Sequence, residues 1–116
     1  MVSQTRKKSS SVDWESFGWD MVYRVGSALD RWCWDVSGDP ALDCYAAHQD
    51  RSLYELAEEF VGEGFGITDE DVKLLQKMPK KYYKKFDAEI RRRIEKVVDN
   101  LMEEWGEEYR EKYGFG

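Results

Sequence analysis

Two long stretches of this chain place apolar residues at steps of three and four, the spacing that puts side chains on one face of an α-helix. The first stretch covers residues 12–36 and the second covers residues 80–113. No segment alternates apolar and polar residues as a half-buried strand would. The pattern predicts an all-α fold, a compact bundle of about five helices with long first and last members.

Capping signals between these stretches predict three shorter helices. Pro40 is tolerated at a first helical position, so a helix should begin there. The residues Ser52 and Glu55 have the spacing of a capping box, in which each side chain satisfies a free backbone amide of the other. Thr68 precedes three acids, an order that favours a helix N-terminus.

Composition and length predict a single folded domain. The chain has 116 residues, of which 41% are hydrophobic and 15% aromatic, too many for an ordinary disordered chain. We expect the helical domain to cover residues 12–116, after a basic, disordered arm over residues 1–11. No apolar run reaches the ~20 residues of a membrane span, and no secretion signal is recognisable. These features predict a cytoplasmic protein that does not enter membranes.

The net charge of −6 conceals a segregation of acids and bases along the chain. Residues 11–71 sum to −12, whereas residues 72–100 sum to +6. Local fields of this kind attract partners even when the net charge does not. Each segment therefore suggests its own kind of partner.

The first long helix carries a second face, opposite its apolar stripe. Aromatic and acidic residues gather there as in a protein-binding hot spot: Trp19, Asp20, Tyr23, Asp30 and Trp34. Either another helix covers this face, or the face contacts a partner. The leading hypothesis is a non-enzymatic regulator or inhibitor that binds another protein. Its carboxylates would imitate a nucleic-acid backbone, as in some inhibitors encoded by viruses and mobile elements.

The basic segment supports an alternative, binding of nucleic acid. Its cations could neutralise phosphates while a tyrosine stacks on a base. The candidate residues are Lys81, Tyr82, Lys85, Arg92 and Lys96. Acids are interleaved with them, and Glu89 and Arg93 have the spacing of an ordinary helical ion pair. A solvated helix face therefore stays open as an explanation.

A third alternative is a small zinc protein that uses Cys33, Cys44 and His48, the only cysteines and the only histidine of the chain. Their spacing matches no zinc finger, so we expect no metal and no other cofactor. A bond between the two cysteines is geometrically feasible, but a reducing compartment would keep them as thiols. As a cysteine nucleophile and its base, the group lacks an identifiable orienting residue. We therefore predict no catalytic residue and no enzyme activity.

The amphipathic C-terminal helix is also compatible with self-association through the aromatic face. Homo-oligomerisation therefore stays open beside binding of another protein.

Overall fold

A computed structural model describes residues 12–35 and 40–113 of the chain, and most of their side chains. Five helices follow one another, and no strand occurs in these two ranges: α2 (Trp14–Asp35), α3 (Pro40–His48), α4 (Leu53–Phe60), α5 (Asp69–Lys77) and α6 (Lys80–Tyr113). The predicted all-α bundle with long first and last helices is confirmed. The expected arm at residues 1–11 lies outside the described residues.

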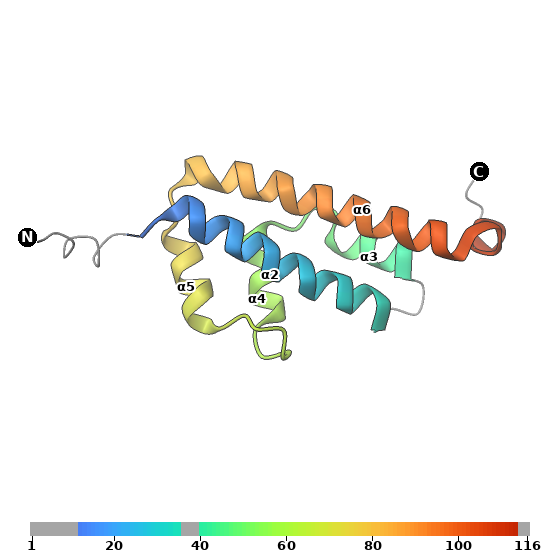
Figure 1. Cartoon of the computed structure of the whole chain (residues 1–116), viewed down its shortest axis with the longest axis horizontal. Coiled ribbons are helices and arrows are strands. Elements are labelled where there is room, and N and C mark those ends of the chain that lie inside the picture. The colour runs from blue at the N-terminus through green and yellow to red at the C-terminus, as the bar shows by residue number, and fades with distance from the viewer. Residues whose placement is uncertain (1–11, 36–39, 114–116) are drawn as a thin grey trace, which may run out of the picture.

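The two long helices lie side by side and run in the same direction (Figure 1). In that view α4 and α5 lie on the side of α2 away from α6. The helix α3 packs against both α6 and α2 near their C-terminal halves. The three short helices thus bring the chain back, so that α6 can start beside the first turns of α2.

The predicted capping box at Ser52 is present, and the predicted N-cap Thr68 also forms a capping box. The Ser52 hydroxyl accepts a hydrogen bond from the Glu55 amide at 3.1 Å, and the Ser52 amide donates to the Glu55 carboxylate at 3.0 Å. Thr68 and Asp71 form the same pair of bonds at the start of α5, at 3.2 and 3.0 Å. A cap of this kind contributes about 1 kcal/mol, so local sequence favours a helix start at both positions. At α4 the Leu53 amide also donates to Asp87 of α6 at 2.7 Å.

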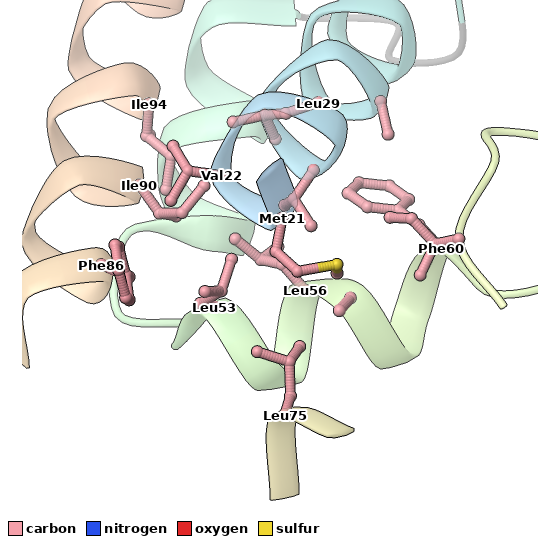
Figure 2. Packing of buried hydrophobic residues seen from close by; sticks show 14 of the residues in the cluster. Met21, Val22, Leu29, Leu53, Leu56, Phe60, Leu75, Phe86, Ile90 and Ile94 are labelled. Carbon is pink, nitrogen blue, oxygen red and sulfur yellow. The ribbon is translucent and has the colours of Figure 1, made fainter. Parts of the chain in front are cut away.

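The core forms where the apolar stripes of α2, α4 and α6 meet. Figure 2 shows their side chains pointing toward one another, with Met21 near the middle and Leu75 of α5 closing the lower side. The largest side chains of this cluster are essentially inaccessible to solvent: Met21, Leu29, Leu53, Leu56, Phe60, Leu75, Phe86, Ile90, Ile94 and Leu101. The three- and four-residue spacing therefore identifies the buried faces correctly.

Two glycines set how closely α2 and α6 pack. A Cβ atom added to Gly18 would overlap the Phe86 ring, with even the ring Cδ2 only 2.6 Å away. At Gly26 an added Cβ would lie 2.7 Å from Cζ of Arg93. Phe86 and Arg93 thus fill the spaces that the missing side chains leave on α2. At Gly18 the helices can approach this closely only because the position lacks a side chain, since Phe86 is buried. At Gly26 the missing side chain leaves room for the flexible end of Arg93.

The expectation of one uninterrupted helix over residues 80–113 is wrong. At Gly106 the backbone turns to φ 62° and ψ −139°, outside the helical region. Glycine adopts a positive φ without the steric cost that a Cβ imposes. The apolar stripe continues in sequence across this point, and it therefore gave no sign of the break.

The contact at Gly18 yields a stability prediction. Gly18→Ala should lower the free energy of unfolding by about 2 kcal/mol or more, because the buried Phe86 ring cannot yield without displacing the core. Urea denaturation monitored by circular dichroism measures the change. Ser27→Ala, at an exposed position of the same helix, is the matched control and should be neutral or slightly stabilising. Equal stabilities of Gly18→Ala and the control would contradict the close packing.

Candidate functional site

Three aromatic side chains of α2 form an exposed stripe. Trp19, Tyr23 and Trp34 have 41%, 68% and 47% of their surface accessible. The helical spacing places them on one side of α2. The other large hydrophobic residue exposed in the described ranges, Val12, lies two positions before the first residue of this helix. Of the two explanations for this face, burial under another helix is excluded for the described chain, and exposure to solvent is observed.

The aromatic stripe, as we call Trp19, Tyr23 and Trp34, borders α6 at Trp19. The Trp19 ring meets the Phe86 ring edge-on, with centroids 5.2 Å apart. The Lys85 ammonium lies 5.6 Å from the centroid of the same tryptophan. Trp19 is therefore anchored on one side and open on the other, which holds its ring in place without covering it.

The two acids predicted to flank this stripe are both engaged in ion pairs within the chain. Asp30 accepts a hydrogen bond from Arg93 of α6 at 3.0 Å. Asp20 lies 3.4 Å from Arg24, whose guanidinium also donates to Asp71 at 2.7 Å. These pairs partly neutralise the carboxylates, so the surface around the stripe is of mixed charge.

The predicted nucleic-acid residues lie along α6, next to the aromatic stripe. We call Lys81, Lys85, Arg92 and Lys96 the basic flank; all four side chains are exposed. Tyr82 is half-buried and its ring is stacked on that of Phe86 at 6.3 Å, which leaves less of it for a base. Lys85 forms an ion pair with Glu15 of α2.

One predicted ion pair is wrong. Glu89 pairs with Arg92, three residues on, rather than with Arg93. Arg93 instead turns toward α2, where it fills the space over Gly26 and binds Asp30. The four-residue rule for helix surfaces describes exposed pairs, and Arg93 is only partly exposed because α2 covers it.

The exposed carboxylates of the acidic segment lie largely away from the stripe. Several are on α4 and α5, on the other side of α2 from α6 (Figure 1): Glu55, Glu58, Glu59, Asp69 and Glu70. These carboxylates are therefore not neighbours of the stripe, whereas Lys85 of α6 lies against Trp19. The sequence alone suggested that acids surround the stripe, because the basic helix α6 is far from α2 along the chain.

The candidate zinc ligands are arranged differently from a metal site. Cys33 and Cys44 form a disulfide that joins α2 to α3, with Cα atoms 5.8 Å apart. Their sulfurs are therefore not available as thiolates, and the expectation of two thiols is wrong for this structure. The described residues contain no cluster of three His, Cys, Asp or Glu side chains that could hold a metal ion. The bond also leaves the suggested cysteine nucleophile without its thiol.

His48 is buried beside this disulfide in an aromatic setting. Its ring is 1% accessible and meets the Trp32 ring edge-on, with centroids 4.8 Å apart. Neither ring nitrogen has a hydrogen-bond partner among the described residues. Burial disfavours the charged imidazolium and lowers the pKa of His48 below its ordinary value of 6.5. The ring is therefore neutral at pH 7 and contributes to packing.

Sequence reasoning missed a polar hollow between α2 and α6. Its volume is about 180 Å³. The hollow is lined by Asp30, Arg92, Arg93, Lys96, Val97 and Asn100. Only the charge run over residues 91–96 hinted at it, since the lining residues from the two helices lie far apart in sequence.

No protein-family model, curated protein or solved structure matches this chain. In the ranges that the structure describes, no helix is both long and apolar enough to span a bilayer. The function must therefore be inferred from the side chains of the surface itself.

The disulfide yields a second prediction. Reduction should destabilise the protein by roughly 3 kcal/mol, the loop-closure value for a short cross-linked segment. Thermal unfolding with and without a phosphine reductant measures this effect. The double variant Cys33→Ala/Cys44→Ala is the control, and its melting temperature should not respond to the reductant. Two titratable thiols in the denatured, unreduced protein would contradict the bond.

His48 yields a prediction on pH. The folded state holds its proton less tightly than the unfolded state, so stability is complete above the unfolded pKa and falls as the pH drops below about 6.5. The limiting slope is about 1.4 kcal/mol per pH unit. Urea denaturation at several pH values between 5.5 and 7.5 should show that the wild type loses stability toward the lower pH, with a slope that does not exceed this limit. His48→Phe is the control, and subtracting its curve of stability against pH from that of the wild type cancels the carboxylate contributions, which both proteins share. Parallel curves of the wild type and the variant would exclude an effect of His48.

Proposed function

We propose that this protein is a non-enzymatic regulator or inhibitor that binds another protein through the aromatic stripe and the side chains around it. The exposure of Trp19, Tyr23 and Trp34 on one flank of α2 carries the proposal. Tryptophan, tyrosine and arginine are the residues that dominate binding energy at protein interfaces. Leaving three large aromatic rings in water costs hydrophobic free energy that a partner would recover.

Mixed charge beside the stripe favours a protein partner over nucleic acid. Glu15, Asp30 and Glu89 each pair with a cation of α6. These acids weaken the attraction of a phosphate backbone, and the net charge of −6 opposes it further. A protein surface can match such alternating charges residue by residue, whereas a uniformly charged strand cannot.

The basic flank indicates the chemistry of the partner surface. A partner with carboxylates around an apolar pocket would place the pocket over the stripe and its acids against Lys81, Lys85, Arg92 and Lys96. The acids of α4 and α5 lie on the other side and would stay outside such a contact. Imitation of nucleic acid by those acids stays a separate prediction.

A second candidate function is binding of single-stranded nucleic acid. The specific observation is that Lys85 lies against Trp19, so that a stacking ring and cations occur side by side. Fluorescence anisotropy with labelled single-stranded DNA and RNA tests it across a salt series. Binding that weakens steeply with salt, and that is lost on charge reversal of Lys81, Lys85 and Arg92, would support it.

The disulfide also bears on the location of the protein in the cell, which is a matter of proposal. Disulfides persist mainly in oxidising compartments and are rare in the cytosol. The Cys33–Cys44 bond therefore speaks against the cytoplasmic location that the sequence suggested. Trapping thiols in intact source cells before lysis would show which state of the two cysteines is present there.

The protein-binding proposal predicts the behaviour of two variants. Tyr23→Ala and Trp34→Ala should each weaken partner binding about 30-fold, the effect of a hot-spot residue worth roughly 2 kcal/mol. Tyr23 is 68% exposed and Trp34 is 47% exposed, and neither belongs to the buried core, so the melting temperature should change little. Affinity capture from source-cell extract, followed by titration of the captured partner, measures the loss.

Glu58→Ala, exposed on α4, is the matched control and should capture the partner as the wild type does. Equal capture by the aromatic variants would contradict the proposal. Sedimentation of the purified protein separates a second outcome, in which the stripe joins two copies of this chain.

A further inference from the structure

The polar hollow between α2 and α6 has the features of an anion site. Three cationic side chains and one amide line it: Arg92, Arg93, Lys96 and Asn100. Its volume of about 180 Å³ is several times the ~30 Å³ that one water molecule occupies in the liquid. A small oxyanion therefore fits among these donors.

Arg93 is held in place before any ligand arrives. Its guanidinium lies over Gly26, where no side chain competes for the space. One terminal nitrogen donates to Asp30 at 3.0 Å, and Asp30 itself lines the hollow. The Nε atom is buried and has no acceptor among the described residues. Because Nε is buried against α2, it is no donor for a ligand in the hollow. The two terminal nitrogens carry the other four of the five N–H donors of a guanidinium. One of these nitrogens donates to Asp30, so terminal donors remain for a ligand.

The charges at the hollow leave one cation without compensation. Asp30 pairs with Arg93, and Glu89 pairs with Arg92 at its edge. Lys96 has no hydrogen-bond or ion-pair partner in the described part of the chain. A bound anion would supply the missing negative charge, and charge-assisted hydrogen bonds are the strong ones.

We infer that this hollow binds a phosphate group. A tetrahedral phosphate has several acceptor oxygens and a charge of about −1.5 to −2 at pH 7, so it can engage Arg93, Lys96 and Asn100 together. A carboxylate has two oxygens and a single charge, and it would satisfy fewer of these donors. The inference does not depend on the proposed protein partner, because a free ion tests it.

Titration of the ¹⁵N-labelled protein with inorganic phosphate at pH 7 tests the site. The Nε–H signal of Arg93 and the side-chain amide of Asn100 should shift along a saturable curve with a millimolar dissociation constant. Sodium chloride at the same ionic strength should not produce this curve. Lys96→Gln should weaken phosphate binding about tenfold, the expected loss of one charged hydrogen bond.

Lys84→Gln is the matched control, because it removes the same charge from an exposed position of α6 outside the hollow. It should bind phosphate as the wild type does. Shifts that grow linearly with phosphate, or an equal loss in both variants, would overturn the site. Acetate that binds as tightly as phosphate would overturn the assignment to a tetrahedral anion.

Discussion

The close approach of α2 and α6 at Gly18 and Gly26 is the contact on which the rest of the structure depends. Phe86 and Arg93 occupy the two spaces that the glycines leave. This contact fixes the rotation of α2 about its axis, with Met21 and Leu29 inside the core. Trp19 and Tyr23 then lie on the flank, in solvent. The exposure of the aromatic stripe therefore follows from the packing of the two helix backbones. No further interaction is needed to keep these rings outside the core.

The same contact brings opposite charges together across the two helices. Lys85 meets Glu15, and Arg93 meets Asp30. Exposed ion pairs of this kind contribute at most about 1 kcal/mol each. Their main effect is on the surface field, because they convert the acidic flank of α2 and the basic flank of α6 into one surface of mixed charge. The arrangement of individual charges on this surface therefore selects a ligand more than the net charge does.

Local signals in the sequence predicted most of the fold, but they could not predict contacts between residues far apart in the chain. The capping box at Ser52 and the N-cap at Thr68 depend on residues at most three positions apart, so the starts of α4 and α5 could be predicted from the sequence. The residue types of the aromatic stripe were also visible, but its exposure was not, since exposure depends on where every other helix packs. Arg93 and Asp30 are 63 positions apart, and only the folded chain shows that they form a hollow. Whether Cys33 and Cys44 form a bond depends on the redox environment, and the spacing of the two residues carries no information about that environment.

The parallel order of α2 and α6 has a consequence for how the protein is made. Glu15 and Lys85 are separated by 70 positions, so their contact closes a loop that includes three whole helices. Contacts of such range slow folding relative to bundles of neighbouring antiparallel helices. During synthesis, α2 leaves the ribosome long before α6, and until then only the short helices made in between can cover part of its apolar face. Neither half of the chain can present the complete surface, which exists only after both ends have met.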